Sequence, residues 1–228
     1  MSPETATPIQ VDIVSDVMCP WCFIGKRNLE AASALLKDVD LTINWRPYQL
    51  DPTLPPQGKD RLAYMTEKFG SPERSAMLHQ RVEEAGREAG IEFDFAAIAV
   101  SPNTLDAHRL IRWAGGQGVE VQNRVVTRLF ELFFTKGANI GDHAVLSSVA
   151  REAGMDGALV DELLASDADK DAVQSEIAVA RQAGVTGVPC FILEGRHALT
   201  GAQPPQVIAD AIRQLAAQKA AGARPVAG

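Results

Sequence analysis

The stretch VMCPWCFIG, from Val17 to Gly25, places two cysteines three positions apart with only a proline and a tryptophan between them. Such a pair can be half of a metal site, a structural disulfide or a working redox centre. These interpretations predict different chemistry, so the surroundings of Cys19 and Cys22 decide both the fold and the function.

The segments on both sides of the cysteines change from a strand pattern to a helix pattern. Residues 9–16 alternate apolar and polar side chains and are rich in β-branched residues, which is typical of a strand. From Pro20 onward apolar residues recur near helical spacing, and proline suits a first helical turn. A second strand is predicted over residues 41–50, before the turn-forming DPTLPP. This order indicates an α/β domain with Cys19 at a helix N-terminus.

A long helical segment follows the second predicted strand. From Lys59 to about Ala183 the pattern is helical, in pieces that end at glycines such as Gly70 and Gly137. The segment is far too long for a loop. The sequence therefore predicts a helical subdomain, residues 59–183, inserted into a framework made of residues 1–58 and 184–228.

The framework resumes after the insertion. CFIL, residues 190–193, and HALT, residues 197–200, read as strands joined by the short turn Glu194–Gly195, which requires an antiparallel pair. A final helix is predicted from Pro204, and the Ala-rich tail, residues 216–228, is predicted to fray. The result is a small mixed sheet surrounded by helices.

Composition limits the classes of function. Of the 228 residues 46% are hydrophobic and 22% charged, and the net charge is -7. Because the chain has no excess of positive charge, neither nucleic acid nor an anionic membrane is an expected partner. The start MSPETATPIQ lacks a secretory pattern, and no apolar run is long enough for a membrane span. We therefore expect a cytoplasmic protein, where structural disulfides are disfavoured.

The redox interpretation fits the cysteines best. A structural zinc site needs four ligands, but the chain has one other cysteine, Cys190, and four scattered histidines, so we expect no metal. A disulfide that closes so small a loop restrains the unfolded chain little. At a helix N-terminus, free N–H groups and the helix dipole favour the Cys19 thiolate, the attacking species in disulfide exchange. Cys22, one turn further and less exposed, is placed to resolve the mixed disulfide.

Three motifs together resemble a known family. CPWC after a strand, SPNTLDAHRL in the insertion and GVTGVPCFIL before the final hairpin resemble the DsbA family, in particular its FrnE-like branch. The resemblance implies an α/β thioredoxin fold with a large all-helical insertion between the second and third strands. It also implies a thiol-disulfide oxidoreductase or isomerase, of the protein disulfide isomerase type, with Cys19 as nucleophile, Cys22 as resolving cysteine and Pro189 as a cis-proline facing them. The residues alone leave a cis and a trans bond before Pro189 equally open.

Further residues are candidates for substrate contact. A cis bond would let the backbone of Val188 pair with a substrate as a short extra strand. Trp21 either forms an apolar wall for the substrate or packs on the helix start, and Pro20 lies beside it. The substrate would be a protein or a small-molecule thiol or disulfide. No bound cofactor is expected, and glutathione is the expected redox partner. Because Pro-Trp lacks the histidine of strongly oxidising relatives, we expect a less oxidising couple.

Several polar residues have simpler interpretations. Asp16, just before the motif, either relays protons or caps the strand end, and the cap is favoured. His108 and Arg109 are interpreted as packing residues of an insertion helix, and Asn103 as the cap of that helix. Cys190 is interpreted as a small buried hydrophobic residue.

The main alternative is a glutathione-dependent enzyme. Hydroxychromene-carboxylate isomerases and kappa-class glutathione transferases are similar in fold and insertion and act on small hydrophobic molecules with glutathione as cosubstrate. They usually carry a serine at the position of Cys19, so the intact CPWC favours disulfide exchange. A chaperone without turnover would be favoured only if the cysteines were dispensable.

Overall fold

A four-stranded sheet forms the framework of the molecule. The computed structural model describes residues 6–222. The sheet contains β1 (Thr7–Ser15), β2 (Val39–Pro47), β5 (Cys190–Leu193) and β6 (His197–Thr200). Its order is β2-β1-β5-β6, with β1 parallel to β2 and antiparallel to β5, and β5 antiparallel to β6. The mixed sheet and the antiparallel final hairpin are therefore confirmed.

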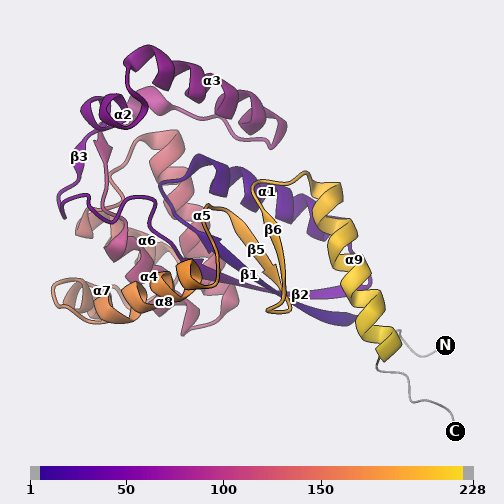
Figure 1. The fold of residues 1–228 in the computed structure, drawn as a ribbon. Coiled ribbons are helices and arrows are strands. Elements are labelled where there is room, and N and C mark those ends of the chain that lie inside the picture. The colour runs from indigo at the N-terminus through magenta and orange to yellow at the C-terminus, as the bar shows by residue number, and fades with distance from the viewer. Residues whose placement is uncertain (1–5, 223–228) are drawn as a thin grey trace, which may run out of the picture.

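The central strand explains why the fold closes around it. Ile9, Val11 and Ile13 lie on one face of β1 and are each at most 1% exposed, and Val14 on the opposite face is 2% exposed, so neighbours cover both faces of the strand. Helix α1 (Pro20–Ala34) and helix α9 (Pro205–Gly222) lie together beside the sheet, and the helices of the insertion lie at the end of the molecule away from α9, some of them against α1 (Figure 1). A strand buried on both faces gains stability from nearly every apolar side chain it carries.

The insertion lies between β2 and β5, the second and third strands of the sheet. Its helices are α2 (Arg61–Phe69), α3 (Pro72–Glu88), α4 (Leu105–Gly115), α5 (Val119–Lys136), α6 (His143–Glu152), α7 (Gly157–Leu164) and α8 (Lys170–Gln182). A short 3-10 helix, η1 (Phe95–Ala97), and a two-residue ladder between β3 (Lys59–Asp60) and β4 (Val100–Ser101) accompany them. The thioredoxin fold with a large helical insertion is thus confirmed, with this ladder as an addition.

Helix boundaries follow the local signals with two differences. Helix α5 ends at Gly137 with φ 65°, where a Cβ would lie 2.1 Å from the Ala97 carbonyl oxygen, so only glycine fits. The N-cap of α4 is Thr104 instead of Asn103, although the Asn103 side chain accepts the Leu105 N–H. The tail from residue 216 is predicted to fray, but residues 216–222 form the last turns of α9, so this part of the prediction is wrong.

Helix α9 continues because its last turns are tied to the framework. The Lys219 ammonium group donates to the Pro8 carbonyl oxygen at 2.8 Å and pairs with Glu194 at 3.0 Å. Residues 223–228 of the predicted tail lie outside the described residues. Within residues 6–222, no helix is both long and apolar enough to cross a membrane.

An aromatic cluster joins the insertion to α1. The ring of Phe23 stacks on that of Phe130 at 5.2 Å between centroids, and Phe93 meets both Phe23 and Phe134 edge to face. Phe23, Phe130 and Phe134 are each at most 1% exposed. Aromatic pairs add to the gain from burial alone, so this cluster fixes the insertion against the helix that carries the cysteines.

A buried arginine closes the insertion on its other side. The Arg109 side chain is fully buried and donates to the carbonyl oxygens of Leu163, Ser166 and Ala168, while it pairs with Asp106 at 2.7 Å. These carbonyls lie in and just after the end of α7, where backbone acceptors have no helical partner. Arg109 is thus a satisfied packing residue, as expected.

Arg109→Met should lower the free energy of unfolding by about 3 kcal/mol, because it leaves several buried acceptors without a donor. Arg112→Met is the matched control on the same helix. Its guanidinium is 42% exposed and pairs with Asp169 and Glu176 at the surface, so its loss should cost less than about 1 kcal/mol. Urea unfolding of both variants checks this, and equal costs would contradict the role given to Arg109.

Candidate active site

The cysteines lie where β1 gives way to α1. Cys19 is the N-cap of α1 with extended backbone angles, and Pro20 occupies the first helical turn. The Cys19 N–H donates to the Asp16 carbonyl oxygen at 2.9 Å, and the Cys22 N–H donates to the Cys19 carbonyl oxygen at 3.0 Å. The expected position of Cys19 at a helix N-terminus is therefore confirmed.

Both thiols are more buried than expected. Cys19 is 4% exposed and Cys22 is 1% exposed, and neither is in a disulfide. The sequence makes Cys19 the more exposed thiol of the pair, but in the structure it is almost fully buried, and its Sγ faces the carbonyl oxygen of Val188 at 3.7 Å. Trp21 between them is 40% exposed. The tryptophan, not the sulfur atoms, therefore forms the surface of the motif.

Burial also controls the protonation of two of the thiols. Burial raises the pKa of Cys22 well above its ordinary value, and the neighbouring Cys19 raises it further, while Ser15 and Asp16 act in the opposite direction. Burial likewise raises the pKa of Cys190. The Cys22 and Cys190 thiols are thus held in the protonated, unreactive form near neutral pH.

The loop before β5 faces the cysteines. The Val188–Pro189 peptide bond is cis. Pro189 packs on Gly25 of α1 so closely that a Cβ on Gly25 would lie 2.9 Å from Pro189 Cγ and 3.2 Å from the Phe191 ring. Within residues 6–222 the Val188 N–H makes no hydrogen bond. Gly25 was not singled out from the sequence, since its importance lies in this long-range contact.

Asp16 connects the motif to two distant segments. Its fully buried carboxylate accepts the Leu50 N–H at 2.7 Å and the Met18 N–H at 3.4 Å, and lies 3.4 Å from Nε2 of His108. The favoured interpretation of Asp16 as a cap agrees with these backbone contacts. His108 is 2% exposed and lies beside the motif, although the sequence only placed it on an insertion helix.

Cys190 has apolar surroundings. It is 2% exposed and packs with Val14, Tyr48 and Val185. These contacts agree with its interpretation as a small buried hydrophobic residue. It also lines a cavity of about 470 Å³ beside Val188.

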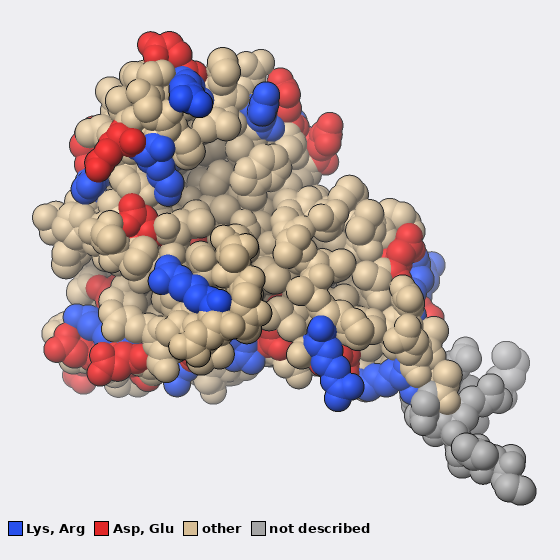
Figure 2. Space-filling view, viewed as in Figure 1, with Lys and Arg blue, Asp and Glu red and all other residues tan. Residues whose placement is uncertain are grey.

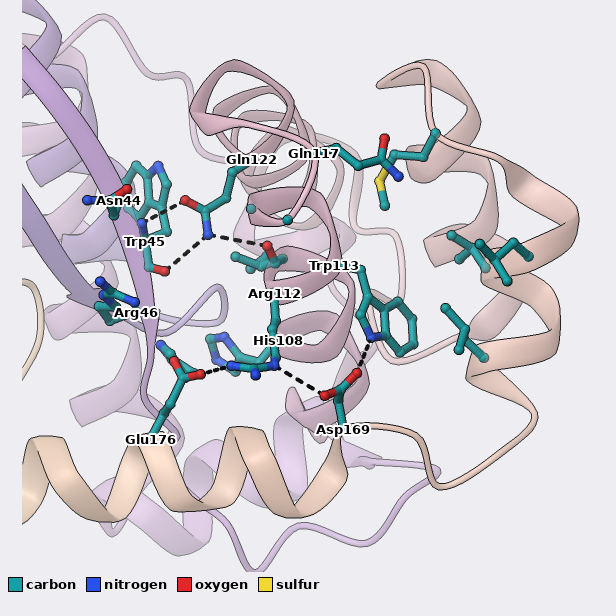
Figure 3. A pocket seen from close by; sticks show the side chains of 18 of the residues that line it. Asn44, Trp45, Arg46, His108, Arg112, Trp113, Gln117, Gln122, Asp169 and Glu176 are labelled. Atoms are coloured by element: carbon teal, nitrogen blue, oxygen red, sulfur yellow. Dashed lines mark hydrogen bonds and ion pairs between the residues drawn. The ribbon is translucent and has the colours of Figure 1, made fainter.

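A larger cavity of about 630 Å³ lies between β2 and helices α4, α7 and α8 (Figure 3). Gln122 closes the free edge of β2 there, since its side chain accepts the Trp45 N–H at 2.9 Å and donates to the Trp45 carbonyl oxygen at 3.2 Å. Arg112 and Trp113 both donate to Asp169 across it. His108 lines this cavity, but neither Cys19 nor Cys22 does.

The face around the motif carries few charges. Figure 2 shows a broad uncharged surface over α1, β5 and β6, with a hollow between the α2–α3 pair and the start of α1. Lysine, arginine, aspartate and glutamate side chains gather around its margins. Such a surface suits contact with a partly apolar partner.

Comparisons with known proteins agree with this geometry. The family model described as DSBA-like thioredoxin domain matches residues 10–213. An uncharacterized protein of Bacillus subtilis, YwbO, is 29% identical over 207 residues, covering 90% of this chain and 96% of the relative. The crystal structure of a probable DsbA oxidoreductase from Streptomyces coelicolor superposes with TM-score 0.83 at 28% identity, covering 96% of this chain and 93% of that one. A 2-hydroxychromene-2-carboxylate isomerase shares the fold, with TM-score 0.70, 17% identity and 94% and 100% coverage.

Gly25→Ala should displace Pro189, because the added methyl group meets a ring that cannot rotate away. Overpacking of this kind costs about 1–3 kcal/mol, although alanine is the better helix former. We expect lower thermal stability and slower disulfide exchange. Gly187→Ala, in the same loop as Pro189, is the control for stability, since its Cβ would meet no atom within 4 Å. Full exchange activity in Gly25→Ala would show that the contact does not position the loop.

Brief alkylation of the reduced protein near pH 7 with a small reagent should label Cys19 before Cys22 and Cys190. The raised pKa values of the latter two thiols reduce their thiolate fractions about tenfold per unit. Mass spectrometry of peptides gives the order, and labelling in urea provides the unfolded reference. Equal labelling of the three thiols in the folded protein would contradict the assignment of Cys19 as the attacking thiol.

Proposed function

The chain belongs to the DSBA-like thioredoxin domain family, and on this basis we propose that it is a dithiol-disulfide oxidoreductase that works through Cys19 and Cys22. The family match over residues 10–213 and the 28% identical probable DsbA oxidoreductase of Streptomyces coelicolor both support an oxidoreductase. The observation that carries the finer proposal is the pair of free thiols at the N-terminus of α1, with Cys19 facing the Val188 carbonyl.

The proposed reaction has two exchange steps. The Cys19 thiolate attacks one sulfur of a substrate disulfide, forming a mixed disulfide and releasing the other sulfur as a thiolate. The Cys22 thiol then loses its proton and attacks Cys19 Sγ, which releases the second substrate thiolate and leaves a Cys19–Cys22 disulfide. Two electrons pass from the protein to the substrate, and the reverse sequence oxidises a dithiol.

The second step is the slower one in this proposal. Burial favours the protonated Cys22 thiol, whereas only the thiolate attacks. The mixed disulfide therefore persists long enough for a substrate to exchange alternative sulfurs, which is the requirement for isomerisation. An oxidoreductase with isomerase activity follows from the same pair of residues.

Substrate contact is proposed at the edge of the motif. The free Val188 N–H and its carbonyl group would pair with an extended substrate segment. Trp21 is half-exposed and would cover apolar substrate side chains, while Pro20 shapes the helix start beside it. A substrate that pairs with the Val188 carbonyl releases Cys19 from that contact, so binding and activation of the thiol coincide.

The proposed partners are thiols and disulfides of proteins or small molecules. Glutathione is the proposed redox partner, with no cofactor permanently bound, and the cytoplasm is the proposed location. Because the Pro-Trp pair supplies no histidine, the Cys19 thiolate lacks one cationic neighbour. We therefore propose a couple less oxidising than that of histidine-containing relatives, which suits a reductase or an isomerase.

Cys22→Ser tests the two-step reaction. Attack by Cys19 remains but resolution is lost, so mixed disulfides with glutathione should accumulate and insulin reduction with dithiothreitol should fall at least about tenfold. Cys190→Ser is the matched control, since that thiol packs away from the motif and should leave the rate nearly unchanged. Unchanged turnover in Cys22→Ser would instead favour a glutathione-dependent isomerase or transferase, whose chemistry needs one activated group.

A further inference from the structure

Another cavity lies on the α2–α3 pair, and no cysteine lines it. Its volume is about 380 Å³, which is within the range of small-molecule sites. Arg61, Ser75 and His79 supply polar groups, and Met65, Phe95 and Ile98 supply apolar walls. Neither Cys19, Cys22 nor Val188 borders it, so it is a separate feature of the insertion.

Arg61 carries a buried charge that the protein does not neutralise. The residue is 9% exposed, and no carboxylate of residues 6–222 lies within 4.0 Å of its guanidinium nitrogens. Its one side-chain hydrogen bond is long, 3.4 Å from Nη1 to Ser101 Oγ, and its Nε has no partner among the described residues. The Phe133 ring, 6.0 Å away, compensates only partly. Burial lowers the pKa of Arg61 to about 10, so it is still charged at pH 7.

A comparison with Arg109, another buried arginine of the insertion, shows how unusual the lack of partners around Arg61 is. Arg109 is even more deeply buried, but Asp106 and three carbonyl groups satisfy it. A buried charge without such partners is destabilising. Arg61 therefore has hydrogen-bonding capacity that an external anion can use.

His79 adds a second unsatisfied nitrogen to the same cavity. Its ring stacks on Phe95 at 4.2 Å between centroids, and its Nε2 is buried without a partner in the described chain. Burial and the nearby Arg61 lower the pKa of His79 to about 4, so it is neutral at pH 7. A neutral imidazole can donate one N–H to an acceptor beside the guanidinium.

We propose that this cavity binds a small organic monocarboxylate. The carboxylate would accept hydrogen bonds from Arg61 and His79, and its apolar body would lie against Met65, Phe95 and Ile98. A planar guanidinium matches a carboxylate in shape and charge. Asp60 at the border carries a negative charge, which disfavours a phosphate dianion more strongly than a monoanion. The ligand class is thus an acid with one charge and an apolar chain or ring.

Titration calorimetry of the full chain with benzoate and hexanoate tests the proposal, with benzamide and inorganic phosphate as comparison probes. At least one of the two acids should bind, and neither comparison probe should. Arg61→Met should weaken binding at least tenfold, whereas Arg81→Met, an exposed arginine of α3 outside the cavity, should leave it unchanged. Insulin reduction by both variants checks that they remain folded.

A second measurement works on the unaltered protein. NMR of the His79 ring should show a rise of its pKa when the acid is bound, because the carboxylate stabilises the imidazolium. The proposal is overturned if neither acid binds, if benzamide or phosphate binds as well as the acids, or if Arg61→Met binds them unchanged. It is also overturned if the bound acid leaves the His79 signals and their titration unaltered, an outcome that does not depend on whether Arg61→Met folds.

Discussion

The close approach of Pro189 to Gly25 is the contact on which the thiol site depends. It brings the loop before β5 onto the second turn of α1, and the same loop then places the Val188 carbonyl 3.7 Å from Cys19 Sγ. The pairing of β1 with β5 extends from this point, since Val14 lies opposite Cys190. One contact between distant parts of the chain thereby aligns the sheet, the helix and the loop around two sulfur atoms.

Buried polar groups distinguish the structural parts of the insertion from the parts available to ligands. Arg109 and Gln122 are both buried, and each satisfies backbone groups that secondary structure leaves free: the end of α7 in one case and the edge of β2 in the other. Such residues hold helices and strands together and have no hydrogen-bonding capacity left for a ligand. Arg61 and His79 differ because their buried nitrogens are unsatisfied. Unpaired buried groups are uncommon in native proteins, and the proposal rests on two of them lining the same cavity.

The sequence predicts the parts of the fold that local patterns control. Strand alternation, the proline at the start of α1 and the short Glu194–Gly195 turn suffice for the mixed sheet, and CPWC suffices for the thiol pair at a helix N-terminus. The burial of Cys19 was missed because the covering group comes from Val188, far along the chain. The His108 position beside Asp16 and the Gly25 contact were missed for the same reason. A histidine or a glycine carries no sequence signal for the distant helix or strand that it will contact.

Burial of the thiols affects both their protection from oxidation and their reactivity in the proposed mechanism. Both thiols of the pair are buried, and the Val188 carbonyl faces Cys19, so solvent oxidants reach the pair poorly, and the raised pKa of Cys22 reinforces this protection. The same burial would make Cys22 a slow resolving group. Ser15 and Asp16, in the turn that ends β1, oppose that effect by favouring the Cys22 thiolate, so the turn contributes to reactivity as well as to the fold. A substrate that displaces Cys19 from the Val188 carbonyl would remove only the cover over the first thiol. In the proposed reaction, attack and resolution would therefore depend on different neighbours: the Val188 loop would affect the first step, and the end of β1 would affect the second.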